Sequence, residues 1–446
     1  MRVLQVNKFL WESAGPERYM LEVSELLRAG GHEVLFFAMQ HQRNLPSPHS
    51  RYFVSQINYR NTSAWYKLKT ALRTAGKAIY SLESRRKMRA LLAEVRPDVA
   101  HLHCISRQIS PSILPALKEA GVPIVQTVHN AELVCPAAHL YQEHRREICQ
   151  RCLDGRYYRA AIHRCVHGSC AASALMAAAQ YVHRGSRIFQ RHVDLFIAPS
   201  RFLAGKLIEG GMPQEKIRVL PNFIDLSRYT PTAESGAYGL YLGRLSPEKG
   251  LITLLEAAAQ APEVPLVLVG EGPQAEVLHQ LAQDKGLRNV TFAGYKRGEE
   301  LKDMVRGAAF VVLPSECFEN SPMAIYEAGA MARPVLASHI GGIPELVVEG
   351  QTGLLFEPGN VQQLADGMAR LHRDRRLCRE LGRCGREHVE EICGTHYERL
   401  LALYAEAAGG RPGDSEDVEL CDTVTTLRGN GFTQRRQGAK KLGLRI

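Results

Sequence analysis

Short apolar runs alternate with longer amphipathic stretches along most of the chain. In the first half the stretches at about 16–29 and 109–120 have helical periodicity, and the apolar runs between such stretches read RVLQVN, EVLFFAM, VAHLH and PIVQTVHN. Apolar runs of this length, alternating with helical stretches, indicate strands of a parallel sheet with helices on its faces. The pattern therefore predicts a doubly wound α/β domain.

The same alternation begins again in the second half, with the runs LYLGRL, PLVLVG, VTFAGY, FVVLPS and PVLAS. Two such series predict two Rossmann-like domains that face each other across a cleft, with ligands at the carboxyl ends of the strands. Proline, serine and glycine concentrate at 221–236, after the run IRVL. We therefore expect an N-terminal domain over residues 1–220 and a C-terminal domain over residues 221–390.

The end of the chain changes character. Residues 391–408 have the spacing of an amphipathic helix, whereas residues 409–446 lose all hydrophobic periodicity and are predicted to be a disordered tail. No apolar run approaches the ~20 residues that span a bilayer, and the N-terminus enters a strand rather than a signal peptide. These features predict a cytoplasmic protein.

The net charge of +10 is concentrated in one segment. Residues 51–96 read as one or two basic amphipathic helices with Trp65, Tyr66 and Tyr80 interleaved. A solvated helix face explains this pattern of charge as well as a lipid-binding surface does. A surface that binds anionic lipid would bring the protein into peripheral contact with the inner face of a membrane. Nucleic acid ranks last and is not expected as a partner, because no recognisable nucleic-acid module accompanies the charge.

Two glutamates, Glu319 and Glu327, lie across a predicted junction between a loop and a helix in PSECFENSPMAIYEAGA. Ser321 is expected to be the N-cap, with Pro322 in the first turn. The start of a helix attracts anions such as phosphate. Carboxylates beside it are not expected to bind that phosphate themselves, so they are suited to hydroxyls or to a developing cation. An acidic pair near a helix start is, taken alone, more often a matter of capping and solvation.

Arg244 and Lys249 flank a turn that follows another apolar strand, YGLYLG, and their cationic side chains suit a diphosphate. A sugar nucleotide combines a diphosphate, a ribose diol and a hexose in one molecule. The motifs together therefore predict a site for a nucleoside diphosphate sugar.

Residues 238–371 resemble the donor-binding domain of the retaining glycosyltransferases of family four (glycosyl transferases group 1), which have the GT-B fold. The resemblance rests on GRLSPEKG, LVGEGP, the paired glutamates and ASHIGGIPELVVEGQTGLLFEPGN, in this order and spacing. It implies that residues 391–408 cross back onto the N-terminal domain. It also implies these roles: Arg244 and Lys249 bind the diphosphate, Gly270 of LVGEGP belongs to the donor site, Glu327 binds the ribose hydroxyls, and Glu319 faces the donor sugar.

On the N-terminal side, Gly15 connects the first strand to the first helix, where a glycine permits close approach of a phosphate or sugar. The resemblance places His129, at the end of PIVQTVHN, near the donor sugar, although a structural histidine is the commoner case at such a position.

The chain departs from the family pattern at several of these positions. Ala14 replaces a usual glycine, Ala332 replaces a glycine that usually ends a helix, and Asn320, Ser321 and Pro322 follow the first glutamate. Asn320 and Ser321 can still offer amides to the diphosphate, whereas Pro322 cannot.

Five of the eleven cysteines cluster between positions 135 and 170, in a predicted insertion over residues 131–170. A Cys-x-x-Cys pair with single cysteines on either side is the ligand spacing of a closed, structural zinc site. Free buried thiols are the alternative. The resemblance extends to family-four enzymes that carry such an insertion, and it favours Cys135, Cys149, Cys152 and Cys165 as ligands, with Cys170 as a substitute.

These observations predict a retaining glycosyltransferase that moves a hexose from a nucleoside diphosphate sugar to a hydroxyl of a lipid-linked or polysaccharide glycan. Arg244 and Lys249 would stabilise the leaving diphosphate, and Glu319 and His129 would orient the sugar. No organic cofactor and no essential magnesium are expected. The alternatives are a GT-B epimerase acting on the sugar nucleotide and, outside the enzymes, a zinc-containing basic protein that binds nucleic acid.

Overall fold

A computed structural model describes residues 1–56, 76–77, 79–106, 108–232, 234 and 236–410. Its N-terminal part is built on a six-stranded sheet with the order β2-β1-β3-β4-β7-β8, in which every neighbouring pair is parallel. The strands are β1 (Arg2–Val6), β2 (Glu33–Phe37), β3 (Val99–Leu102), β4 (Ile124–Thr127), β7 (Leu195–Ala198) and β8 (Ile217–Val219). The helices of this part are α1 (Gly15–Ala29), α3 (Leu82–Glu94), α4 (Ile113–Glu119), α7 (Ile188–His192) and α8 (Arg201–Glu209).

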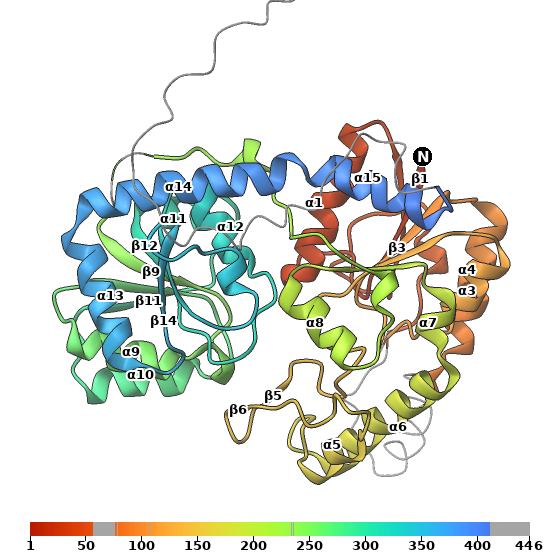
Figure 1. Cartoon of the computed structure of the whole chain (residues 1–446), viewed down its shortest axis with the longest axis horizontal. Helices are drawn as coiled ribbons and strands as arrows, with labels where there is room; N and C mark the ends of the chain where they lie inside the picture. Colours follow the sequence, from red (N-terminus) through yellow and green to blue (C-terminus); the bar gives the residue numbers. More distant parts are fainter. Residues whose placement is uncertain (57–75, 78, 107, 233, 235, 411–446) are drawn as a thin grey trace, which may run out of the picture.

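The C-terminal part repeats this plan. Its sheet has the order β11-β10-β9-β12-β13-β14, again with parallel neighbours throughout. The strands are β9 (Tyr238–Leu242), β10 (Leu266–Val269), β11 (Val290–Gly294), β12 (Ala308–Leu313), β13 (Val335–Ser338) and β14 (Gly353–Phe356). The helices are α9 (Leu251–Gln260), α10 (Ala275–Asp284), α11 (Gly298–Gly307), α12 (Met323–Ala330) and α13 (Val361–Arg373). The predicted class, two Rossmann-like domains of GT-B type, is confirmed (Figure 1).

Burial explains why the apolar runs form strands. Every residue of β3, β4, β7, β12 and β13 is buried, as expected for strands covered by helices on both faces. The helices are amphipathic: in α13, Leu364, Ala365, Met368 and Leu371 are buried, whereas Gln362, Gln363, Asp366 and Arg370 are exposed. The sequence interpretation left out β7 and β14.

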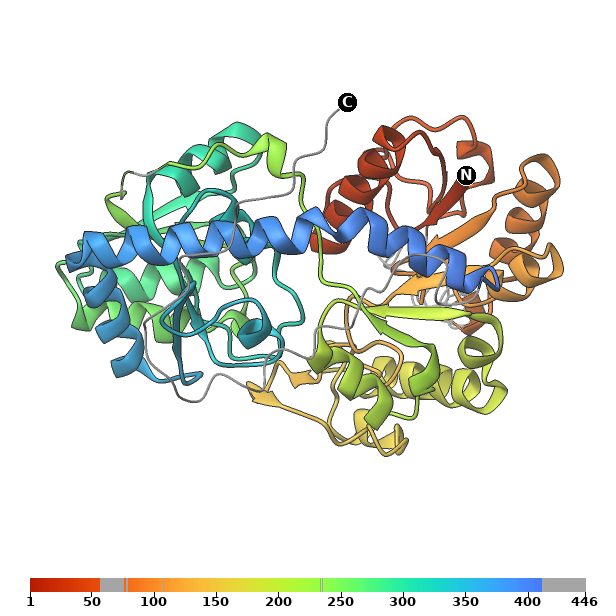
Figure 2. The same cartoon turned by 45° about the horizontal axis from the view of Figure 1, so that its top comes forward.

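Two consecutive helices, α14 (Arg375–Gly394) and α15 (His396–Ala407), join the domains at the end of the described chain. Figure 2 shows them as one nearly continuous rod that crosses from the C-terminal domain to the N-terminal domain. The buried side chains of α15 include His396, Leu400 and Tyr404, and the helix packs on β4. The predicted helix at 391–408 thus corresponds to the last turn of α14 and to α15.

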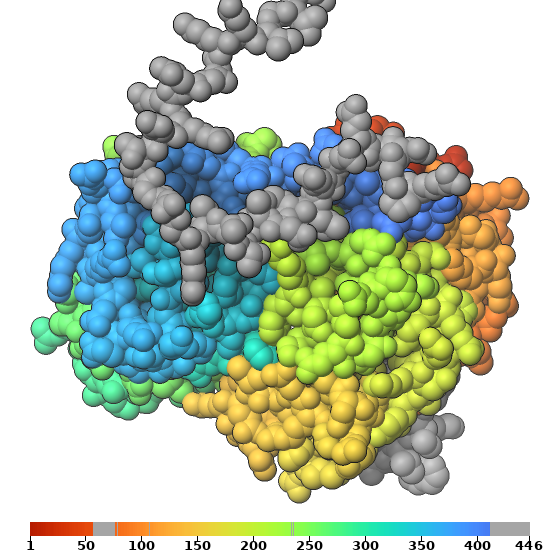
Figure 3. All heavy atoms as spheres, viewed as in Figure 1, coloured from red at the N-terminus to blue at the C-terminus, as the bar shows by residue number. Residues whose placement is uncertain are grey.

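The cysteine-rich insertion forms a separate small unit on the N-terminal domain. It contains the antiparallel pair β5 (Tyr141–Gln142) and β6 (Glu147–Ile148), followed by α5 (Tyr158–Ile162), which packs on α6 (Cys170–Ser186). In Figure 1 the β5–β6 hairpin extends toward the C-terminal domain, and Figure 3 shows the insertion as the yellow-orange surface below the two domains.

Two of the predicted segments fall partly or wholly outside the described residues. These are the middle of the basic segment, with Trp65 and Tyr66, and nearly all of the predicted tail at 409–446. Among the helices that the structure does describe, none combines the length and apolarity required to cross a membrane.

Candidate functional site

Lys249 and Glu319 form an ion pair at the carboxyl edge of the C-terminal sheet. Lys249 ends a short 3-10 turn after β9, Glu319 lies in the loop after β12, and Lys249 Nζ is 2.6 Å from Glu319 Oε1. The Ser315 hydroxyl donates to the same oxygen over 2.7 Å. Burial would raise the pKa of Glu319, but Lys249 and Ser315 hold it below its usual value. Burial would lower the pKa of Lys249, but Glu319 raises it. Both groups therefore stay charged.

Glu327 is engaged across the domain boundary. It lies in the second turn of α12, is almost fully buried, and accepts a hydrogen bond of 2.5 Å from Arg18 Nη1 of α1. The other terminal nitrogen of Arg18 donates to the Tyr229 hydroxyl over 2.5 Å. Burial lowers the pKa of Arg18, but the attraction of Glu327, Tyr229 and Glu12 together with the hydrogen bond to Glu327 more than offsets this effect. The structure therefore places a cation from the N-terminal domain beside the predicted ribose ligand.

The predicted N-cap is wrong. Helix α12 starts at Met323 with Pro322 in the N-cap position, and no side chain caps it. The Ser321 hydroxyl instead lies 2.8 Å from the Tyr326 hydroxyl. Proline leaves the preceding backbone in an extended conformation, which moves the helix start one residue later than the serine signal indicated. Ser321 stays close to the helix end that carries the positive dipole.

Arg244 lies at the end of β9, close in sequence to Lys249, and its side chain is exposed. Among the residues that the structure describes, its guanidinium forms no ion pair, so its charge is available to a ligand. Gly270, at the end of β10, has a φ of 142°, and a Cβ there would lie 1.9 Å from the carbonyl oxygen of Gly243. Gly270 therefore permits the close approach of these two loops, and this packing role accounts for the glycine.

Residues from both domains meet at the start of α12. The Asn320 side chain donates to the His129 carbonyl oxygen over 2.8 Å. Gly15 is the first residue of α1, and a Cβ on it would lie 3.7 Å from the Met323 side chain. Two further bonds close the domains: the backbone amides of Arg201 and Phe202 each donate to the Glu345 carboxylate over 2.7 Å. The predicted N-terminal residues Gly15 and His129 therefore lie against the start of the predicted donor-binding helix.

His129 belongs to a buried cluster of neutral histidines. Its Nε2 lies 3.0 Å from His103 Nδ1, and the rings of His103 and His129 are stacked. Burial lowers the pKa of His129 to about 3 and that of His101 to about 3. The pKa of His103 is also far below its usual value because of burial. The N-terminal face of the site is thus rich in imidazoles and carries no histidine charge at neutral pH.

The four predicted zinc ligands lie near one another. Burial comes first in raising the pKa of Cys152 to about 12 and that of Cys165 to about 11, and interactions with the other thiols of the set add to both shifts. Cys135 is buried, and Cys149 contributes to the raised pKa of its thiol. No group of three or more histidine, cysteine, aspartate or glutamate side chains in the described parts of the chain is arranged to hold a metal ion. The zinc prediction is therefore not confirmed.

Most cations in the described part of the basic segment are paired within the protein. In α3, Arg85 and Arg89 both pair with Glu119 of α4, at 2.7 and 2.6 Å. Lys87 lies 3.7 Å from Glu83, one turn away. These pairs favour the solvated helix face over a lipid-binding face for α3.

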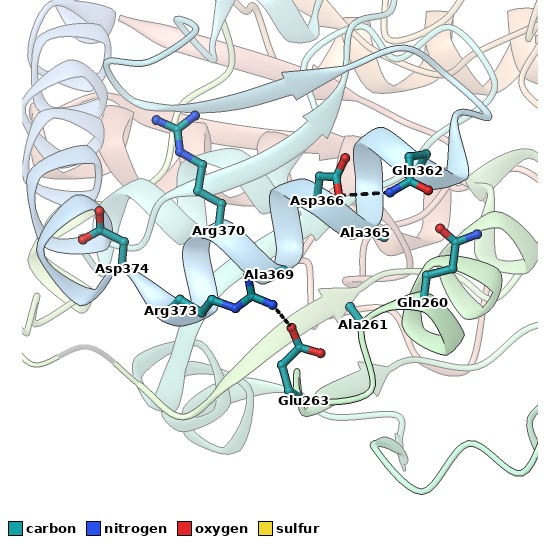
Figure 4. A pocket seen from close by; sticks show the side chains of 10 residues that line it. All are labelled: Gln260, Ala261, Glu263, Gln362, Ala365, Asp366, Ala369, Arg370, Arg373 and Asp374. Carbon is teal, nitrogen blue, oxygen red and sulfur yellow. Dashed lines mark hydrogen bonds and ion pairs between the residues drawn. The ribbon is translucent and has the colours of Figure 1, made fainter.

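A hollow of about 420 Å³ lies away from this site, on the outer side of the C-terminal domain (Figure 4). Residues of α13 and of the end of α9 line it, and Arg373 and Glu263 form an ion pair of 2.6 Å at its edge. None of the predicted site residues lines it. The hollow is open and polar.

Sequence reasoning missed three residues that hold the predicted ligands in place. Arg18 pairs with Glu327, Ser315 donates to Glu319, and His103 contacts His129. Arg18 lies three residues after Gly15, and His103 is the last residue of the apolar run VAHLH, so each stands at a strand or helix end that faces the predicted cleft. This position at the end of an element was the feature of the sequence that could have identified them as site residues.

Two family profiles match consecutive parts of the chain. The profile of Glycosyltransferase Family 4 matches residues 13–228, and that of Glycosyl transferases group 1 matches residues 226–388. The boundary between the matches falls in the region that links the two sheets.

Individual proteins give the same picture. The chain is 25% identical to a glycogen synthase of Mycobacterium tuberculosis over 87% of this chain and 90% of that protein. It is 29% identical to the sulfoquinovosyl transferase SQD2 of Arabidopsis thaliana, over 46% of this chain and 43% of that protein. The match therefore spans less than half the length of the plant enzyme.

Among solved structures, Anabaena HepE in complex with UDP and glucose superposes with a TM-score of 0.62 at 18% sequence identity. The superposition covers 90% of this chain and 100% of that one, and at this identity it speaks for the fold. Both halves match family profiles, and both sheets have the corresponding topology. The chain therefore belongs to family 4 of the glycosyltransferases and has their GT-B fold.

Proposed function

We propose that the protein is a retaining glycosyltransferase that transfers a hexose from a nucleoside diphosphate sugar to a hydroxyl of a glycan acceptor. The observation that carries the proposal is the Lys249–Glu319 pair beside the free cation of Arg244 and the start of α12. These are the groups that a diphosphate and the adjoining sugar require. The UDP and glucose found in HepE, and the polysaccharide product named for the glycogen synthase, support a nucleotide sugar and a glycan acceptor.

The donor would bind with its diphosphate between Arg244, Lys249 and the first amides of α12. Negative charge grows on the leaving diphosphate in the transition state, so these fixed cations and dipoles stabilise it more strongly than they stabilise the ground state. Lys249 lies in reach of both Glu319 and the diphosphate and would shift part of its bonding to the phosphate oxygens.

Glu319 would orient the donor sugar rather than attack it. Its Oε1 already accepts bonds from Lys249 and Ser315, so this carboxylate is held by two partners. Retention would then follow from attack of the acceptor on the same face that the diphosphate leaves, with the departing phosphate taking the proton. One Glu327 oxygen is held by Arg18, and the carboxylate would bind the ribose diol with its remaining capacity.

The experiment is a transfer assay combined with a thermal-shift panel of UDP, GDP, ADP and their sugars. A nucleotide at 100 times its Kd stabilises the protein by ~2.7 kcal/mol, so the matching donor should raise Tm. Arg244→Ala should abolish transfer and weaken the shift without changing the Tm of the free protein. Arg297→Ala is the matched control, because Arg297 is likewise an exposed arginine of the C-terminal domain and is not among the predicted site residues. Absence of any shift with every sugar nucleotide would contradict the proposal.

We also propose that Cys135, Cys149, Cys152 and Cys165 bind one structural zinc ion. Support comes from the four-thiol donor set and from the mutual effects of these thiols on their pKa values. The thiolates would draw together on binding, since the described arrangement is not itself a metal site. Elemental analysis should find one zinc per chain and none in Cys149→Ser, whereas Cys384→Ser should keep it. A metal-free wild-type protein with unchanged Tm would contradict this proposal.

Finally, we propose peripheral contact with an anionic membrane through the basic segment 51–96. The support is the basic sequence composition of the segment as a whole. The cations of α3 that pair with Glu119 and Glu83 do not add to it, because they are already engaged in ion pairs within the protein. The protein should co-float with vesicles containing phosphatidylglycerol and not with pure phosphatidylcholine vesicles. Equal recovery with both kinds of vesicle would contradict the electrostatic contact.

A further inference from the structure

A chain of hydrogen-bonding side chains leads from the middle of the N-terminal sheet to His129. Gln5 of β1 is fully buried, and its Oε1 lies 2.8 Å from His103 Nε2. His103 follows β3 and is also buried, and its Nδ1 lies 3.0 Å from His129 Nε2. The chain thus has a closed end at an amide oxygen and an open end at the His129 imidazole.

The amide oxygen determines where the protons are. A carbonyl oxygen can only accept, so His103 Nε2 must carry a hydrogen and donate it to Gln5. A neutral imidazole has one N–H, so His103 Nδ1 is bare and can only accept. His129 Nε2, at 3.0 Å, must then be the donor. In a neutral His129 this leaves Nδ1 without a hydrogen.

The open end of the chain lies at the predicted cleft. Within the part of the chain that the structure describes, His129 Nδ1 has no hydrogen-bond partner. The backbone of His129 is held by Asn320, whose side chain donates to its carbonyl oxygen over 2.8 Å. The imidazole is therefore fixed on one edge by His103 and through its backbone by the C-terminal domain, and its free edge is an acceptor.

We infer that Gln5 and His103 are positioning residues that set the tautomer of His129, so that His129 Nδ1 accepts a hydrogen bond from a substrate hydroxyl. This inference rests on the proposed function, which brings a sugar to this face. A neutral acceptor has a physical advantage there. An imidazolium would repel the positive charge that develops on the sugar ring during transfer, whereas a neutral nitrogen binds the hydroxyl without that cost.

The first experiment observes the tautomer directly. Histidine side chains labelled with ¹⁵N are assigned with His103→Gln and His129→Gln, and one-bond and long-range ¹H–¹⁵N correlations then report which nitrogen carries the hydrogen. At pH 7 we expect Nε2–H for both His103 and His129. Nδ1–H on His129 would show that the chain runs in the opposite direction, from a reversed Gln5 amide, and would overturn the inference. A charged His129 would overturn it as well.

The second experiment uses activity. Gln5→Leu removes the acceptor that orients His103, and we expect kcat to fall about tenfold with little change in the donor KM, because one oriented hydrogen bond is lost. Gln5→Glu keeps an acceptor oxygen and should keep kcat within about twofold. Gln126→Leu is the matched control, since Gln126 is another fully buried amide of the same sheet, and its side chain has no hydrogen-bond partner among the described residues.

The outcomes separate the two levels of the argument. Equal losses in Gln5→Leu and Gln126→Leu, or none in Gln5→Leu, would overturn the role of Gln5. If Gln5→Leu fails to fold, the Gln5→Glu rate and the wild-type tautomer still decide. If the wild-type protein transfers no sugar while His129 shows the expected tautomer, the proposed function fails and the proton arrangement stands.

Discussion

The two faces of the predicted site hold their polar groups by opposite means. On the C-terminal face, Lys249 and Glu319 form a partly buried charged pair, with 26% and 15% of their side chains exposed, and each keeps the other ionised. On the N-terminal face, His103 and His129 are buried without a charged partner, and burial makes them neutral. Glu327 stands between these cases, because its cationic partner comes from the opposite domain.

The difference corresponds to the two halves of the proposed substrate. A diphosphate leaving group gains negative charge and needs cations, which the C-terminal face supplies. Sugar and acceptor hydroxyls are uncharged and need directional donors and acceptors, which neutral imidazoles supply. In this chain the two domains thus bring a charged half and a neutral half of the predicted site together.

The largest expected effect comes from breaking the charged pair. Lys249→Met leaves the Glu319 carboxylate buried without its cation, which should destabilise the fold by about 3 kcal/mol and abolish transfer. The double variant Lys249→Met/Glu319→Gln removes both charges and should recover most of the stability but none of the activity. Urea unfolding and the transfer assay measure these quantities. Recovery of transfer in the double variant would mean that the pair is structural only.

The next effect concerns the carboxylate shared between the domains. Glu327→Gln should weaken binding of the matching nucleoside diphosphate by roughly tenfold, the factor expected when a charged hydrogen bond becomes a neutral one. It should also remove the preference for the ribonucleotide over its 2′,3′-dideoxy analogue, measured by isothermal titration calorimetry. Glu345→Gln, at the other interdomain contact, should keep that preference. A variant Glu327→Gln that still distinguishes the two nucleotides would refute the ribose assignment.

The last prediction tests the neutral face through pH. The pKa of His101, of His129 and of His396 is lowered to about 3 by burial, against 6.5 for an ordinary histidine. The unfolded chain therefore binds protons below pH 6.5 that the folded chain does not. Stability is full above that pH and falls as the pH drops toward 3, by up to ~1.4 kcal/mol per pH unit for each such histidine.

Urea unfolding between pH 7 and 5 measures this slope. His101→Gln should make it shallower, whereas the exposed His279→Gln should leave it unchanged. Equal slopes in wild type and His101→Gln would show that this histidine ionises in the folded protein.

Part of the fold and of the site could be predicted from local pattern alone. Long apolar runs such as those of β9 and β12 are buried wherever they lie, so their period and length identify strands without knowledge of their neighbours. The run of β7 was left out of the sequence interpretation, and its pairing with β4 and β8 identifies it as a strand. The prediction of Ser321 as the N-cap was wrong because Pro322 occupies the N-cap position and the Ser321 hydroxyl contacts the Tyr326 hydroxyl instead.

A side chain's chemical type is fixed by the sequence, but its partner is not. The sequence by itself determined the two parallel-sheet domains, the cations after β9 and the paired acids around α12, because hydrophobic period and motif spacing are local properties. The tertiary structure alone decided that Arg18 meets Glu327 over 309 positions of chain and that His103 orders the proton of His129. Such pairings depend on which strand ends the topology brings together and on how far water is excluded there. Neither property can be predicted from the residues that are adjacent in the sequence.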